Sequence, residues 1–147
     1  MNEQAVPEAL EGVVTDLHHV AIVVPDLDSA RSLWVETLGL RPGEVEHVAD
    51  QRVDVLVCWA GSQRIELVQP AAEDSPVNGF LEKRGGGLHH LAWRVSNLDR
   101  AIAHLVDAGV RMIDEAPRPG AHGTRIAFVH PKATGGVLCE LVEDPNA

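Results

Sequence analysis

Two stretches of the sequence each carry a pair of adjacent histidines, LHHVAIVV at residues 17–24 and LHHLAWRV at residues 88–95. A glutamate stands in an apolar setting further along each time, Glu66 in IELV and Glu140 in CELV. An ionised carboxylate in an apolar strand is costly unless it is paired with a cation or a metal. Imidazoles and carboxylates together suit a divalent ion such as Co²⁺, Mn²⁺, Ni²⁺ or Zn²⁺. The chemistry to consider first is therefore metal binding.

Strand geometry separates the two histidines of a pair, because alternate side chains of a strand share a face. His90 shares its face with the small Ala92 and with Arg94, whereas the preceding histidine shares its face with bulky apolar side chains. We therefore predict that His90, and by the repeat His19, faces a cleft. The first histidines of the two pairs are expected to pack against helices: His18 and His89.

The predicted ligand set takes one histidine and one glutamate from each half of the chain: His19, Glu66, His90 and Glu140. Any one of these residues alone would more often be structural, but their matched positions favour a shared site. Two carboxylates would balance the charge of a divalent ion. An octahedral ion with four protein ligands would keep two positions for a chelating substrate.

An internal duplication underlies this pairing. Residues 17–34 match residues 88–105 without gaps at eight of 18 positions. Two later blocks repeat in the same order: IELV at 65–68 matches CELV at 139–142, and the dipeptide at 52–53 matches that at 125–126. Three matched blocks in one order indicate two copies of one module.

Each copy shows the pattern strand, helix, three strands. Asp26 and Asn97 are expected N-caps, and Gly39 and Gly109 are expected to end the helices. We expect helices at 27–38 and 98–108 and strands at 16–24, 45–49, 53–59, 63–68, 88–95, 110–114, 124–129 and 137–142. The predicted fold class is α+β, with two βαβββ modules forming a curved mixed sheet around a metal-binding cleft.

The predicted domain organisation is a tail at residues 1–14 and a single domain at 15–147. Its modules span about 15–70 and 86–144 and are joined by a short helical linker from Ser75 to Arg84, followed by the hinge Gly85-Gly86-Gly87. Twelve Lys and Arg against 22 Asp and Glu give a net charge of −10, which disfavours nucleic acid and anionic membranes as partners. The N-terminus shows no targeting signal, which favours the cytoplasm. The two cysteines stand alone in apolar strands, as reduced thiols do.

These features resemble the vicinal oxygen chelate (glyoxalase/dioxygenase) superfamily, and within it the methylmalonyl-CoA epimerase family. The similar stretches include IELVQP, DSPVNGFLEKRGGGLHHLAWRV, GAHGTRIAFVHPK and GGVLCEL, and the resemblance spans residues 17–143. It implies that His19, Glu66, His90 and Glu140 bind the metal, and that the enzyme inverts C2 of methylmalonyl-CoA through an enolate. It also implies a homodimer. Glu140 is our candidate base on one face of the substrate.

One motif departs from the family pattern. Some epimerases carry QGVxE, whose glutamate serves as a second acid or base, but here the stretch reads QRVDV. The carboxylate position is Val55, and the neighbouring Asp54 is expected on the other face of the strand. A water, Glu66 or a residue outside the motifs is left as the second proton carrier.

Substrate contacts are expected from three residues: Lys132 in HPK for the coenzyme A phosphates, Gln51 at the start of QRVDV, and Arg94 on the predicted cleft face. Other basic residues are also candidates for the phosphates: Lys83, Arg84 and Arg125. Three other functions fit the same residues, namely a glyoxalase-type lyase, an epimerase of a related acyl-CoA and a metal-free binding protein.

Overall fold

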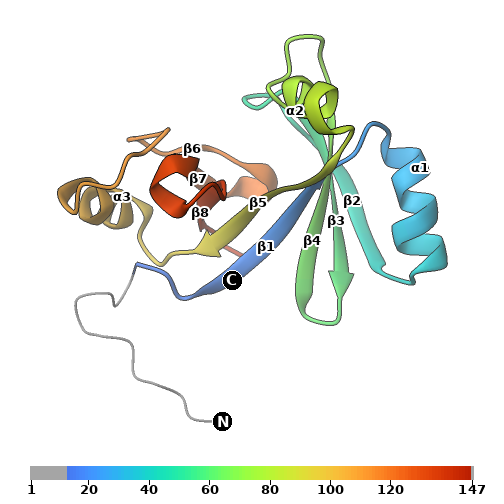
Figure 1. Ribbon diagram of the computed structural model, residues 1–147. Helices are drawn as coiled ribbons and strands as arrows, with labels where there is room; N and C mark the ends of the chain where they lie inside the picture. The colour runs from blue at the N-terminus through green and yellow to red at the C-terminus, as the bar shows by residue number, and fades with distance from the viewer. Residues whose placement is uncertain (1–12, 147) are drawn as a thin grey trace.

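The computed structural model describes residues 13–146, so most of the expected tail, residues 1–12, lies outside the described part of the chain, as does residue 147. The described residues form one eight-stranded sheet. Figure 1 shows it curling into an open half-barrel, with α1 and α3 on the outside. The strands are β1 (Asp16–Val23), β2 (Arg41–Val48), β3 (Val53–Ala60), β4 (Gln63–Pro70), β5 (Gly87–Arg94), β6 (Arg118–Pro119), β7 (Arg125–Val129) and β8 (Cys139–Glu143). The helices are α1 (Leu27–Arg31), η2 (Ser32–Thr37), α2 (Val77–Arg84), α3 (Leu98–Asp107), η3 (Ala121–Gly123) and η4 (Pro131–Thr134).

The sheet order is β2-β3-β4-β1-β5-β8-β7-β6, which is symmetric about the central pair. In each half the first strand pairs in parallel with the last, β1 with β4 and β5 with β8. The two first strands then pair antiparallel with each other. The expected α+β class, with two copies of one module in a curved mixed sheet, is confirmed.

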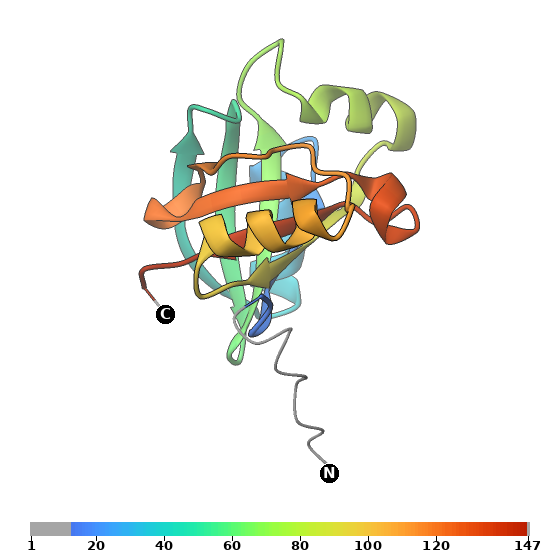
Figure 2. The same ribbon diagram turned by 90° about the vertical axis from the view of Figure 1, so that its left-hand side faces the viewer.

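Helices α1 and α3 cover the outer faces of the two arms. Leu27 of α1 packs with Leu56 and Leu67, and Leu98 of α3 packs with Ala127 in the second arm; Figure 2 shows α3 crossing β7 and β8. The expected caps are present: Asp26 accepts a hydrogen bond from the amide of Ser29, and Asn97 accepts one from the amide of Arg100. Gly39 and Gly109 follow the helices with φ of 82° and 81°, as the sequence predicts. None of the helices within residues 13–146 is long and apolar enough to cross a membrane.

The first helix differs from its prediction as one α-helix over 27–38. It turns from α1 into the π-helical η2, whose wider turn is closed by the Leu38 amide on the Leu33 carbonyl. The Thr37 hydroxyl donates to the Ser32 carbonyl 3.1 Å away, again five residues back. Trp34 still packs against the core under this helix.

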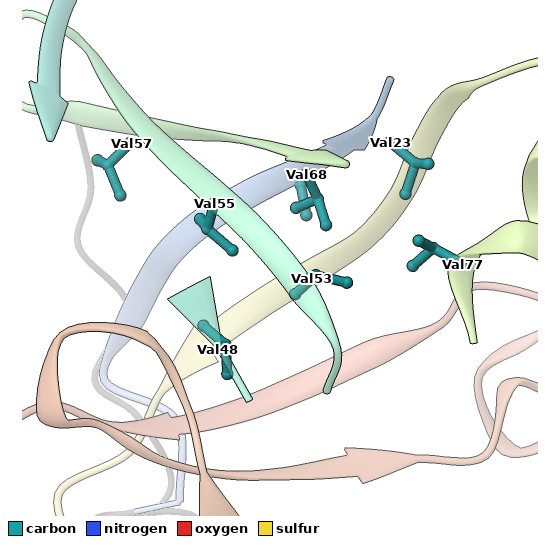
Figure 3. Packing of buried hydrophobic residues seen from close by; sticks show 8 residues of the cluster. Val23, Val48, Val53, Val55, Val57, Val68 and Val77 are labelled. Carbon is teal, nitrogen blue, oxygen red and sulfur yellow. The ribbon is translucent and has the colours of Figure 1, made fainter. Parts of the chain in front are cut away.

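The inner face of the first arm is a wall of valines. The members come from β1 to β4 and α2 and are seen together in Figure 3: Val23, Val48, Val53, Val55, Val57, Val68 and Val77. Alternation along β3 places its odd-numbered valines on this face, while Leu56 and Cys58 face the helix. This arm therefore offers its interior an apolar surface of closely similar side chains.

The second half does not form the predicted strand at 110–114. Met112 makes an isolated bridge to Val129, and β6 is only two residues long. Pro117 and Pro119 lack amide donors, which prevents a continuous ladder. Residues 114–124, here called the strap, instead cross to the first half. There Arg118 lies 2.9 Å from Asp50, and the His122 amide donates to Glu46 over 2.6 Å.

Gly120 holds the strap close to β7. A Cβ at this position would lie 2.4 Å from the Thr124 Oγ1 and 2.7 Å from a methyl of Ile126. Gly120→Ala is therefore expected to destabilise the protein by about 1–3 kcal/mol through overpacking, measured by urea denaturation. The matched control is Gly79→Ala in α2, where nothing lies within 4 Å and a helical alanine is expected to stabilise. Equal effects of the two changes would contradict the packing given for Gly120.

Candidate metal and substrate site

Two β-bulges shape the centre of the sheet. Strands β1 and β5 pair antiparallel, but two residues have no partner across the pair. In β1 the pairing passes from Leu17 to His19 and omits His18. In β5 it passes from Leu88 to His90 and omits His89. A bulge sets two residues of one strand opposite one of its partner and interrupts the alternation of faces. Both histidines of each pair consequently line the same pocket.

This arrangement corrects the expectation that the first histidine of each pair only packs against a helix. The prediction for His18 is wrong, because its ring is buried in the pocket wall and its Nε2 lies 2.7 Å from the Asp144 Oδ2. His89 does pack edge-on against Phe80 of α2, with ring centroids 5.1 Å apart, yet it also lines the pocket. The predicted cleft position of His19 and His90 agrees with the structure.

Three atoms from three strands form a small triangle at the base of the pocket. The His19 Nε2 lies 3.3 Å from the His90 Nε2, and the Glu140 Oε1 lies 3.4 Å and 3.5 Å from these two nitrogens. Ligands about 2.0–2.1 Å from a tetrahedral zinc ion are about 3.3–3.4 Å apart. The spacing and the buried donor types therefore fit a divalent ion held by these three side chains.

Glu66 lies beside this triangle rather than within it. Its Oε2 is 3.1 Å from the Nδ1 of His19, on the other edge of that imidazole. Burial, and then the nearby charge of Glu140, raises the pKa of Glu66 to about 8. Of the four predicted ligands, the structure thus brings three to one point and places the fourth against the back of His19.

Burial also governs the histidines. It lowers the pKa of His19 well below the ordinary value, and electrostatic interaction with the neighbouring His90 and His18 lowers it further. Burial likewise lowers the pKa of His89 to about 4. At neutral pH these rings are uncharged, which is the form in which imidazole binds a metal.

The pocket above the triangle has a volume of about 780 Å³. The valine wall forms one side, and Ile126, Phe128 and Val142 of the second arm form the other. The strap adds Arg118 and His122. An apolar pocket with a few convergent polar groups is typical of a site for a small molecule.

The predicted substrate contacts are distributed unequally. Gln51 lines the pocket, and its amide nitrogen lies 3.4 Å from the Pro119 carbonyl of the strap. Lys132 is exposed on η4 and is not among the residues that line the pocket. Arg94 is also outside this lining, because it extends toward the far end of β5 and pairs with Asp16 at 3.2 Å. The expectation that Arg94 faces the cleft is therefore corrected.

The QRVDV stretch, which departs from the family motif QGVxE, has its side chains on the predicted faces. Val55 is buried in the valine wall at the pocket, whereas Asp54 turns to the opposite face. There Asp54 contacts His47 at 2.9 Å and accepts a hydrogen bond from Gln69 at 3.1 Å. Neither residue thus brings a carboxylate to the pocket.

Sequence reasoning missed several residues that line the pocket, among them Arg64, Phe128 and Asp144. Strand alternation from the known glutamates would have found two of them, since Arg64 precedes Glu66 by two positions and Asp144 follows Glu140 by four.

The Gly- and Pro-rich stretch that holds His122 and His130 is compatible with a pocket border, and the structure places His122 in the pocket lining but not His130. The position of His122 depends on contacts of the strap with the other half of the chain. The residues around His122 do not by themselves indicate its contact with Glu46.

The raised pKa of Glu66 gives a pH prediction for the metal-free protein. The unfolded chain loses this proton near the ordinary value of 4.5, while the folded protein retains it to about pH 8. The contribution to stability is therefore complete below pH 4.5 and is lost as pH rises toward 8. After chelation, the denaturation midpoint is expected to fall over this interval, and Glu66→Gln is expected to flatten the fall. Parallel curves for the two proteins would contradict burial of this carboxyl.

Comparison with known sequences gives the class of this protein. The profile of the Glyoxalase/Bleomycin resistance protein/Dioxygenase superfamily matches residues 18–128. That range covers both histidine pairs, Glu66 and most of the curved sheet. The chain belongs to this superfamily.

Individual relatives narrow the class. The chain is 41% identical over 127 residues to the ethylmalonyl-CoA/methylmalonyl-CoA epimerase of Cereibacter sphaeroides, covering 85% of this chain and 95% of the relative. The crystal structure of methylmalonyl-CoA epimerase from Mycobacterium tuberculosis superposes with a TM-score of 0.86 at 40% identity, with 91% of each chain covered. A methylmalonyl-CoA epimerase in complex with methylmalonyl-CoA and NH4+ has a TM-score of 0.83 at 34% identity, over 90% of this chain and 96% of that one. Within the superfamily, the chain belongs to the methylmalonyl-CoA epimerases, which are isomerases.

Proposed function

We propose that this protein is a metal-dependent epimerase that interconverts (R)- and (S)-methylmalonyl-CoA through an enolate. The observation that carries the proposal is the buried triangle of His19, His90 and Glu140 at the base of an apolar pocket. The family relationship supports the substrate, because relatives with this fold are named for it.

The same three residues would hold the divalent ion, with Glu66 next to them as the predicted fourth ligand. The ion would supply positive charge beside the thioester oxygen, on which the negative charge of the enolate develops. Co²⁺, Mn²⁺, Ni²⁺ and Zn²⁺ all fit this donor set. The two buried carboxylates, Glu66 and Glu140, would together balance the double positive charge of any of these ions.

Glu140 is the base that we assign to one face of the substrate. The α-proton lies between a thioester and a carboxylate, so it is acidic for a carbon-bound proton. The Glu140 Oε1 faces the two imidazoles, which leaves Oε2 as the atom for proton transfer. The valine wall on one side of the pocket makes the surroundings less polar than water, and this strengthens charge interactions in the site.

Inversion needs a second carrier that returns a proton on the opposite face. Val55 removes the family carboxylate from this place, so the candidates are Glu66, a water and a residue outside the motifs, and we assign the role to Glu66 because it lies beside the triangle. Glu66→Gln is expected to slow inversion while exchange of the α-proton with solvent, which needs one carrier only, continues. NMR of the substrate in D₂O separates the two rates, and parallel loss of both would assign Glu66 to the first step instead.

A substrate comparison tests the proposed activity. The metal-loaded protein is expected to epimerise methylmalonyl-CoA, as followed by a coupled assay with a stereospecific second enzyme. Ethylmalonyl-CoA is the second substrate to measure, because one relative is named for both acyl groups. Turnover of the hemithioacetal of methylglyoxal and glutathione alone would overturn the proposal in favour of a glyoxalase-type lyase. The homodimer, the cytoplasmic location and the contact of Lys132 with coenzyme A stay predictions.

A further inference from the structure

We propose that Asp144 and His18 form a hydrogen-bond relay that holds the His19 ring with its Nε2 facing the ligand triangle. Asp144 is on this account a positioning residue, since it acts on the metal ligand through another side chain. The inference rests on the proposed function in one respect, namely that His19 binds the metal through Nε2.

The relay is continuous and buried. The Asp144 Oδ2 lies 2.7 Å from the His18 Nε2, and the His18 Nδ1 lies 2.7 Å from the His19 Nδ1. The Asp144 side chain is 4% exposed and that of His18 is 5% exposed. Asp144 also accepts a hydrogen bond from the Asn146 amide and lies 3.5 Å from Arg64, which favours its ionised form.

Proton counting gives the relay its direction. A neutral imidazole carries one ring proton, so a His19 that offers its Nε2 lone pair to a metal must hold its proton on Nδ1. That proton has two possible acceptors, the His18 Nδ1 at 2.7 Å and the Glu66 Oε2 at 3.1 Å, and the shorter contact assigns it to His18. His18 consequently carries its own proton on Nε2, where the Asp144 carboxylate accepts it. In this arrangement both ring nitrogens of His18 have a partner, and Asp144 fixes which of them carries the proton.

The β-bulge explains why such a relay exists. Regular alternation would turn His18 to the outer face of the sheet, away from both His19 and Asp144. The skipped register at His18 brings its ring into the pocket wall instead. Asp144, the residue that directly follows β8 on the far side of β5, then reaches His18.

The two copies of the module differ at this point. His89 repeats the first contact, with its Nδ1 2.8 Å from the Nδ1 of His90. By the matched blocks 65–68 and 139–142, the position equivalent to Asp144 in the first copy is Pro70, which has no side-chain acceptor. The carboxylate-anchored relay therefore serves His19 alone, and the pseudo-symmetric site is asymmetric in how its two imidazoles are oriented.

Zinc affinity, measured by competition with a chelating dye, tests the relay. Asp144→Asn is expected to weaken zinc binding by about 10–100-fold, the usual effect of losing an outer partner of a metal ligand. The matched control is Asp54→Asn, which removes the carboxylate of another histidine–aspartate pair, at 2.9 Å on the opposite face. It is expected to leave the affinity unchanged. Equal affinities of wild type and Asp144→Asn would overturn the proposal.

A double-mutant cycle separates positioning from general stability. If Asp144 acts through His18, Asp144→Asn should add little to the loss already caused by His18→Gln. An undiminished effect of Asp144→Asn in that background would contradict the relay. A wild-type protein that binds no divalent ion would instead remove the metal from the proposed function, and so the two failures are distinguishable.

The ring protons of the wild-type protein give a test that needs no variant. In the zinc-loaded protein, ¹⁵N chemical shifts are expected to show His19 protonated on Nδ1 and His18 protonated on Nε2. A His18 proton on Nδ1 would overturn the relay, because its contact with His19 would then run in the opposite direction.

Discussion

Glu140→Gln is expected to lower kcat/KM for epimerisation by about 10²–10⁴-fold, the range that loss of a general base produces. The amide keeps the size of the side chain but cannot take the α-proton. It also removes one negative charge from the metal ligands, so the loss should lie toward the upper end. Exchange of the α-deuteron of labelled substrate with solvent water measures the first proton transfer directly.

Glu143→Gln is the matched control for this experiment. Glu143 lies on the same strand, but it pairs with Arg125 at 2.7 Å outside the large pocket. Its substitution is expected to leave the exchange rate within about twofold, as is usual for surface changes. Undiminished exchange in Glu140→Gln would remove Glu140 as the base while leaving its ligand role open.

His90→Ala is expected to abolish stoichiometric metal binding. The change removes one corner of the triangle from a site whose remaining two corners are 3.4 Å apart. We expect zinc affinity to fall by more than about 100-fold, beyond the effect of losing an outer partner. Metal content after dialysis and titration with zinc are the measurements.

The His90→Ala experiment needs a control variant and a check that the variant folds. His47→Ala removes an exposed histidine on the other face of the sheet and is expected to retain one ion per chain. Circular dichroism and the denaturation midpoint show whether His90→Ala still folds. A folded His90→Ala protein that keeps wild-type affinity would contradict the proposed site.

The symmetric part of this molecule could be predicted from the sequence. Matched blocks in the two halves implied equivalent strands, and equivalent strands meet across the central β1–β5 pair. His19, His90 and Glu140 could be brought together by that reasoning alone. It works because strand register and alternation are periodic and leave a trace in residue types.

The asymmetric part could not be predicted. The bulges at His18 and His89 break the alternation on which the assignment of faces relied, and a bulge has no fixed residue pattern at these positions. The strap keeps only the two-residue β6 in the sheet. Its position is set by Arg118 and His122, whose partners Asp50 and Glu46 belong to the other half. Such features depend on contacts between segments far apart in the chain, so the sequence around each residue carries little of the information.

The most direct test of the central claim is the dependence of substrate exchange on metal. Methylmalonyl-CoA in D₂O is followed by NMR with the metal-loaded protein, the chelated protein and the chelated protein given one equivalent of Co²⁺ or Zn²⁺. We predict exchange of the α-proton with the loaded protein, its loss after chelation and its recovery near one equivalent of metal. Exchange that continues undiminished in the chelated protein would contradict a metal held by His19, His90 and Glu140 as the source of the activity.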